Sequence, residues 1–478
     1  MKATERKAQG VRVFAGACGA VLAALMLMGC QKQPVEQAHS PSNPEPGLSG
    51  GPIPGETSPA NPFAGPGVYP QPYFEGVRVV GHSERGGMQM GWIGHCAYLA
   101  MGGGDDGGIA VVDVSDPAAP RDVQVLTDPG ASAATEAFDA RETLSGRAIV
   151  IGGDRLVGGR DTQPSRLSIY DASGDCTKPR HMAEFTWPEP LHTMHISPDG
   201  MLIYGAYLEP MADRGGIHVL DISDMANPRY LGKFGATGAD GRTWEFTPHN
   251  VVLSPDGQRL YAATMGSTGG DMNQDFTTPL GEYSIERFGP RAGGVYVFDS
   301  SDFAQRRPNP QLRVIGLAPH AGWHDVTLAN INGAPHLVGT GEGLVPCPGA
   351  FPAITNISDL AHPRVVGEFR TDMNRPENCP PIPPGPPSPE AQSRQSSHFS
   401  SVDSETNTRL GLFSMSAAGY RIADLQDPAN PREIAYFRPG PRCSGFSRYV
   451  AETGHIWMSC GAAGFYVLEL TPEVKAAL

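Results

Sequence analysis

The sequence predicts an all-β protein, a seven-bladed β-propeller of four-stranded blades that an N-terminal strand closes. Two observations predict this fold. First, an apolar run that ends in Asp or Asn and is followed by a polar turn rich in Ser, Asp and Pro returns along the chain, at 109–121, 217–229, 354–364 and 420–432. Second, hairpins with a Pro-Asp-Gly turn, at 192–204 and 249–261, precede two such runs. Tandem four-stranded units are typical of propeller blades, and six or eight blades also fit the repeats.

Length and composition agree with a large folded body. The chain has 478 residues, of which 40% are hydrophobic and 18% are charged, so it has enough apolar side chains for a core. This balance excludes a polytopic membrane protein and a wholly disordered chain. The formal net charge is −14 and Lys and Arg form no stripe, which argues against nucleic acid as a partner.

The first residues have the layout of a secretory signal. Four basic residues precede an uncharged stretch, 13–29, which ends in Leu27-Met28-Gly29-Cys30. A signal anchor is the alternative, because the stretch is close to the shortest length that spans a membrane. The ending resembles the bacterial lipobox, in which the cysteine is acylated and becomes the new N-terminus. We therefore predict a signal peptide at 1–29 and lipidation at Cys30.

The segment after Cys30 is rich in Pro, Gly and Ser, which prevents helices and strands from propagating. We interpret 30–73 as a tether to the membrane, 74–471 as the propeller with a Pro-rich insert at 371–397, and 472–478 as a C-terminal tail. Gln31 follows the cysteine, and by the sorting rule of Gram-negative lipoproteins this favours the outer membrane. The predicted location is thus the bacterial cell envelope, on its periplasmic or surface face.

The strands of the body follow from the repeats. β-branched and aromatic runs bounded by Asp-Pro and Gly turns are typical of strands. The innermost strands of the seven blades are expected to start near Met88, Glu136, His192, His249, His324, His398 and Ser447. The last blade stops after its third strand at Leu470, and residues 74–82 resemble the outer strand of the other blades. We expect 74–82 to pair with 465–470 and so to close the ring.

The repeated segments, of which 109–121 is the clearest, resemble the LVIVD-repeat family of secreted or surface β-propellers. The resemblance covers about 74–470, and the second, fourth and seventh blades depart from it. It implies a fold and a location, and it does not imply a reaction.

Six cysteines follow the signal and Cys30. An even number in an exported chain permits disulfides. Cys443 and Cys460 flank one hairpin, and Cys347 and Cys379 flank the insert of the fifth blade, so we predict these two bonds. Cys96 and Cys176 are expected to be buried thiols.

Four histidines share one register in consecutive blades: His192, His249, His324 and His398 each begin an innermost strand. Because innermost strands line the central channel, these side chains should meet at one mouth. Imidazoles there either bind a metal ion, with copper or zinc as the candidates, or hydrogen-bond water in the channel. His195 is a fifth candidate, and Asp325 or Glu245 are candidates for orienting the rings.

Two short segments add a further resemblance. Residues 191–195 and 248–251 resemble the selenium-binding-protein and methanethiol-oxidase propellers, whose channel histidines hold copper, and 248–257 also resembles the lactonase propellers. Three functional hypotheses result. The first is a lipid-anchored binding module or scaffold for an envelope protein or glycan, the second is a copper-type oxidoreductase, and the third is a lactonase-like hydrolase.

Replacing Cys30 by Ser tests the anchor. Acyl chains on Cys30 would hold the protein in the detergent phase. We therefore expect the Cys30→Ser variant to keep its signal uncleaved and to lose the partitioning that acylation causes. Cys18→Ser, which changes a thiol inside the same hydrophobic stretch, should leave both properties unaltered. An unchanged processed N-terminus and unchanged partitioning in Cys30→Ser would refute lipidation.

Overall fold

The structure is a computed structural model, and its described residues belong to one compact unit, Leu48–Leu478. They are 73–103, 107–154, 165–207, 215–244, 246–264, 293–319, 324–341, 350–371, 397–415, 418–439, 443 and 445–478. The predicted signal peptide, Cys30, nearly all of the tether, 372–396 of the insert, Cys347, Cys379 and Glu245 lie outside these residues.

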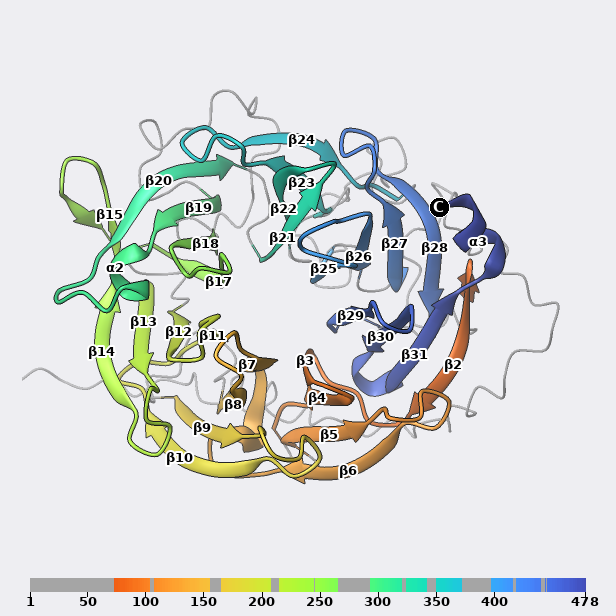
Figure 1. Cartoon of the computed structure of the whole chain (residues 1–478), viewed down its shortest axis with the longest axis horizontal. Helices are drawn as coiled ribbons and strands as arrows, with labels where there is room; N and C mark the ends of the chain where they lie inside the picture. Colours follow the sequence, from red (N-terminus) through yellow and green to blue (C-terminus); the bar gives the residue numbers. More distant parts are fainter. Residues whose placement is uncertain are drawn as a thin grey trace, which may run out of the picture. The chain divides into compact units, whose positions relative to one another are not determined.

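The strands of the described residues form seven β-sheets that follow one another around a ring (Figure 1). Each sheet contains the four strands of one blade, which are consecutive in the sequence in every blade but the seventh. Blade 1 comprises β3 (Gln89–Ile93), β4 (Cys96–Ala100), β5 (Ile109–Asp113) and β6 (Arg121–Leu126), and blade 2 comprises β7 (Ala134–Glu142), β8 (Ala148–Asp154), β9 (Arg166–Asp171) and β10 (Arg180–Thr186). Blade 3 comprises β11 (Thr193–Ile196), β12 (Leu202–Tyr207), β13 (Gly216–Asp221) and β14 (Arg229–Phe234), and blade 4 comprises β17 (Pro248–Leu253), β18 (Arg259–Thr264), β19 (Gly294–Asp299) and β20 (Leu312–Pro319). The seven-bladed all-β fold is therefore confirmed.

The remaining blades show how the ring closes. Blade 5 comprises β21 (Asp325–Ile331), β22 (Ala334–Thr340), β23 (Ala353–Asn356) and β24 (Arg364–Glu368), and blade 6 comprises β25 (Ser400–Val402), β26 (Leu410–Ser414), β27 (Tyr420–Asp424) and β28 (Arg432–Arg438). Blade 7 comprises β29 (Ser447–Val450), β30 (His455–Ser459), β31 (Phe465–Leu470) and, from the N-terminal side, β2 (Val77–Ser83). The antiparallel pairing of β2 with β31 confirms the predicted closure.

Short strands and helices are added to the seven blades. β1 (Tyr73–Glu75) adds a fifth strand to blade 6 next to β28, and β15 (Ala236–Thr237) with β16 (Thr243–Trp244) extends blade 4. The described helical segments are η1 (Ala131–Ala133), α2 (Ser301–Ala304), η7 (Gly461–Ala463) and α3 (Pro472–Ala477), so the predicted tail includes a helix. Among the helices in the described part, none is long and apolar enough to cross a membrane.

The core lies between the blades. The described residues form seven apolar clusters, one for each pair of neighbouring blades. Side chains alternate along a strand, so Ile109 and Val111 of β5 pack toward blade 2 while Ala110 and Val112 pack toward blade 7. Because both faces of a blade are buried, its middle strands are continuous apolar runs.

The Asp-Pro turns connect neighbouring blades. Each outermost strand contains a β-bulge whose extra residue is apolar, and in four blades a glycine follows it, at Gly81, Gly232, Gly316 and Gly367. A Cβ at Gly81, Gly316 or Gly367 would collide with a carbonyl oxygen in the turn of the next blade, for example that of Pro117 against Gly81. The bulge and the glycine thus let the turn of one blade pack against the outer strand of the blade before it.

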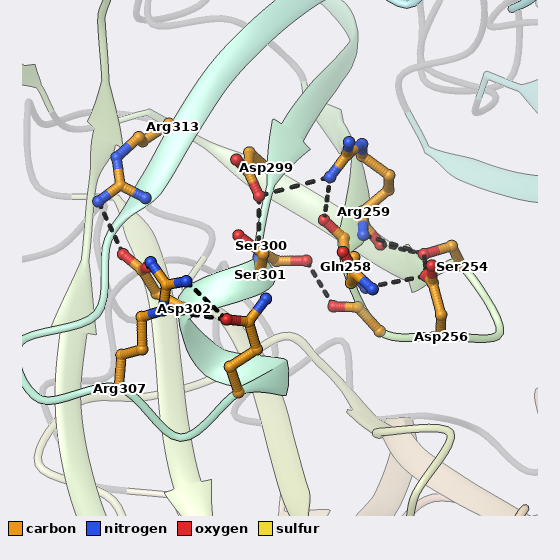
Figure 2. A network of polar contacts seen from close by, with 12 residues as sticks. Ser254, Asp256, Gln258, Arg259, Asp299, Ser300, Ser301, Asp302, Arg307 and Arg313 are labelled. Atoms are coloured by element: carbon orange, nitrogen blue, oxygen red, sulfur yellow. Dashed lines mark hydrogen bonds and ion pairs between the residues drawn. The ribbon is translucent and has the colours of Figure 1, made fainter.

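The Asp that ends each apolar run caps the turn that follows. Asp113 accepts a hydrogen bond from the backbone N–H of Ser115 (2.9 Å) and pairs with Arg121. Blade 4 replaces this turn by helix α2 and keeps the cap, because Asp299 accepts from the N–H of Ser301 (2.9 Å) and from Arg259 (3.4 Å), as Figure 2 shows. Blade 4 therefore keeps the aspartate cap although its turn sequence departs from the repeat.

The structure contains two disulfides among the described cysteines. Cys443 is joined to Cys460 across the hairpin of blade 7, as the sequence predicted. Cys96 is joined to Cys176, with Cα atoms 5.9 Å apart, so the expectation of buried thiols is wrong for this pair. The reason is the packing of turns on neighbouring blades: the turn of blade 2 lies on blade 1, where Gln124 donates to the carbonyl of Thr177 (2.7 Å).

Deletions test how much the closure contributes to stability. Removing 31–72 leaves every described strand in place, and we expect it to leave the melting temperature unchanged. Removing 31–83 deletes β1 and β2, exposes the edge of β31 and uncovers apolar surface of blade 7, so it should lower the melting temperature by about 10 °C or more. Equal melting of the two deletions would contradict closure by β2.

Candidate metal centre

Four histidines meet where the innermost strands of blades 3 to 6 begin. Neighbouring ring centroids are 4.1 Å apart for His192 and His249, 4.0 Å for His249 and His324, and 4.3 Å for His324 and His398. All four residues are less than a tenth exposed. The structure thus brings together the four histidines that the register singles out.

Glu136 of blade 2 completes this group. Its Oε2 atom lies 3.1 Å from Nε2 of His192, 3.8 Å from Nε2 of His249 and 3.9 Å from Nε2 of His324. Glu136 was expected near the start of an innermost strand and was not among the predicted site residues. Its position near the start of an innermost strand, which the four histidines share, was the sequence signal that could have identified it. We call His192, His249, His324, His398 and Glu136 the histidine–glutamate cluster.

Local structure fixes the backbone under the cluster. The N–H groups of His192, His324 and His398 each donate to a carbonyl in the second strand of their own blade, at 2.8–2.9 Å. Across blade boundaries, the hydroxyl of Thr193 donates to the carbonyl of His249 (2.6 Å) and that of Thr340 to the carbonyl of His398 (2.6 Å). These bonds hold the imidazoles at defined positions around the axis.

Two of the five residues sit at irregularities of their strands. The pairing of β7 with β8 shifts between Ala134 and Phe138, around Glu136, and that of β17 with β18 shifts between Pro248 and Asn250, at His249. A β-bulge turns a side chain away from its regular direction. The bulges account for how Glu136 and His249 reach the common site.

His195 lies beside the cluster in a second layer. Its Nε2 donates to Oδ1 of Asn250 (2.5 Å), and Nδ2 of Asn250 donates to Asp325. Asp325 also accepts from the backbone N–H of Ser400 (2.9 Å). We call His195, Asn250, Asp325 and Ser400 the polar belt, which links blades 3 to 6 directly next to the cluster. Neither His195 nor Asp325 belongs to the groups of metal-ligand atoms described below.

Burial controls the charge of the belt. Desolvation lowers the pKa of His195 below its ordinary value, so its ring is neutral near pH 7. Desolvation also raises the pKa of Asp325, although the hydrogen bonds from Ser400 and Asn250 oppose this shift. The belt therefore depends on its hydrogen bonds, because a buried polar group without a partner is costly.

The ligand atoms of the cluster form two groups. In the first, atoms of Glu136, His192 and His249 all lie within 4.8 Å of one another, and in the second the same holds for Glu136, His324 and His398. Imidazole nitrogens with a carboxylate oxygen are a donor set that suits copper and zinc. The residues present therefore fit a transition-metal ion.

Two other groups of ligand-type residues lie outside the channel. One, His95 with Cys96 and Cys176, contains the disulfide sulfurs. The other consists of Asp128, His181 and Glu184, whose oxygens already accept hydrogen bonds, as from the hydroxyl of Tyr170 to Asp128 (2.7 Å). Both groups have structural explanations.

The comparisons with known proteins agree with the fold. Residues 94–126 match the model of the LVIVD repeat. The chain is thus a seven-bladed propeller with an LVIVD repeat, and the matched segment contains the Asp113 turn. No curated protein matches the chain in sequence.

Solved structures resemble it distantly. The periplasmic gluconolactonase of Pseudomonas aeruginosa has a TM-score of 0.49 and 12% identity, covering 83% of this chain and 92% of that chain. A hypothetical selenium-binding protein from Sulfolobus tokodaii has a TM-score of 0.47 and 15% identity, and the match covers 77% of this chain and 84% of that chain. Hydrazine synthase of Kuenenia stuttgartiensis has a TM-score of 0.47 and 14% identity, and the match covers 80% of this chain and 95% of that chain. Similarity at this level carries no inference about activity.

The polar belt makes Asn250 critical for stability. Asn250→Asp would place a second carboxylate against buried Asp325, and we expect a loss of about 3 kcal/mol in the free energy of unfolding. The control is Asn227→Asp, which creates the same contact with Asp224 at an exposed turn and should cost less than about 1 kcal/mol. Urea denaturation measures the free energy of unfolding of both variants. Similar losses in the two variants would show that the polar belt does not stabilise the channel.

Proposed function

We propose that this protein is a transition-metal-dependent oxidoreductase of the copper type whose metal centre is built from His192, His249, His324, His398 and Glu136. One observation carries the proposal: five consecutive blades direct four imidazoles and one carboxylate to the same buried place. Bound copper would supply one-electron redox chemistry, and the chain's own residues would bind and orient it.

Electrostatics is compatible with a metal ion at this place. Glu136 can pair with one protonated imidazole, as its 3.1 Å contact with His192 permits, but protonating several of these rings together would bring like charges close. A divalent cation would pair with Glu136 while the histidines that bind it stay neutral.

The donor set favours copper. The Nε2 atoms of His192 and His249 are 2.7 Å apart, so they share one proton or bind one ion. Cu(II) binds sites made of imidazole and carboxylate ligands more tightly than Zn(II) does. Zinc is the alternative outcome of the test.

The proposed location is the bacterial envelope, with the propeller tethered to the outer membrane through lipidated Cys30. The support is the signal layout and the lipobox-like ending, together with the disulfides, which persist in oxidising compartments. The scaffold for an envelope protein or glycan and the lactonase-like hydrolase stay predictions, because nothing among the residues that the structure describes specifies either of them.

Elemental analysis of the purified full chain tests the metal. We expect copper to be retained after copper-replete growth. We expect the double variant His249→Ala, His324→Ala to lose at least about 100-fold in affinity, because it removes one ligand from each group. Binding should also weaken as the pH falls through the histidine range, since protons compete for the imidazoles.

His362→Ala is the matched control, since its side chain is 83% exposed and pairs with Asp359 in a surface turn. It should bind metal as the parent does. A parent that retains neither copper nor zinc, and whose melting temperature does not respond to either ion, would refute the metal centre.

A further inference from the structure

The histidine–glutamate cluster offers more donors than one ion can use. It has four imidazoles and a carboxylate, and its ligand atoms divide into two triads, Glu136 with His192 and His249, and Glu136 with His324 and His398. The triads share Glu136 and no other residue. Each triad takes its histidines from two adjacent blades.

The arc of rings is too long for a single ion. Neighbouring centroids are 4.0–4.3 Å apart. In an ideal seven-fold ring with this spacing, the first and fourth rings, His192 and His398, lie roughly 9 Å apart. Two imidazoles on opposite sides of one ion, bound at about 2.0 Å, have centroids only roughly 6 Å apart. One ion would therefore leave at least one histidine out of reach.

Glu136 lies between the two pairs. Its Oε2 atom is 3.1 Å and 3.8 Å from the Nε2 atoms of His192 and His249, and 3.9 Å from that of His324 on the other side. A carboxylate in this place can bind an ion of each pair. Paired metal sites of enzymes hold their ions about 3.5–4 Å apart, which a shared carboxylate permits.

We infer that the centre holds two transition-metal ions, one bound by His192 and His249, the other by His324 and His398, with Glu136 bridging them. The inference rests on the proposed function and specifies its site. Among the described residues each ion would then have three ligands, which is the number that catalytic rather than structural sites supply.

The surroundings suit the added charge. Two divalent ions with one carboxylate leave a large positive charge in a buried place. Asp325 in the polar belt follows His324 directly in sequence, and Asp139 of β7 lies 3.7 Å from the ring of His195. Both are buried carboxylates next to the cluster. Asp139 already pairs with Arg141 (2.8 Å), so Asp325 is the carboxylate that would offset part of this charge.

The number of bound ions tests the inference. The full chain, purified in detergent and depleted of metal, is titrated with Zn²⁺ and with Cu²⁺, and the bound metal is counted per chain. We expect two ions for the parent and for the control His362→Ala. His192→Ala and His398→Ala each disrupt one triad, so each should bind one ion. The melting temperature of every variant shows that it is folded.

A spectroscopic measurement is independent of the variants. Two Cu²⁺ ions that share a carboxylate are magnetically coupled, so the electron paramagnetic resonance spin count of the copper-loaded parent should fall below its copper content. In His398→Ala the spin count should equal the copper content.

The outcomes separate the two proposals. Two ions with a reduced spin count support the bridged pair. A parent that binds one ion overturns the pair and leaves the metal-dependent function intact, and two ions with a full spin count overturn the bridge by Glu136. A parent that binds no ion overturns the proposed function itself, and the pair with it.

Discussion

The packing of each blade against both of its neighbours is the constraint on which this structure depends. Alternate residues of one strand contribute to different interfaces, as Ile109 and Ala110 do, so neither face of a sheet can be left to solvent. In an open row of such sheets, the first and the last sheet would each expose one apolar face to solvent. Closing the row into a ring buries both faces. The pairing of β2 with β31, which joins residues almost four hundred positions apart, completes the blade that packs against blade 1 and so ties the two ends of the ring together.

The same closure builds the site. In a ring the first strands of all blades point to one axis, so equivalent positions in successive blades approach one another there. Propeller blades surround a central channel, and here Glu136 and four histidines converge at it and are buried. The cost of burying these polar groups is offset by their contacts with one another and, in the proposed function, by metal ions.

Rigidity around the site has an identifiable source. The polar belt fixes the strands that carry three of the histidines, because Asn250 follows His249, Asp325 follows His324 and Ser400 lies two residues after His398. The hydroxyls of Thr193 and Thr340 add bonds across blade boundaries. A site whose ligands come from five separate sheets needs such cross-links, since a displacement between blades would change the distances between its ligands.

The sequence alone determined the fold class, the start of each innermost strand, the closing segment and the four histidines. This was possible because repeats, turns and strand alternation are local patterns that can be recognised in the sequence itself. The tertiary structure decided what depends on contacts between blades. It joined Cys96 to Cys176 because the turn of one blade packs on its neighbour, and it brought in Glu136 and set His195 apart in the belt because bulges and cross-blade hydrogen bonds direct side chains. Such contacts join residues far apart in the chain, and no local pattern in the sequence records them.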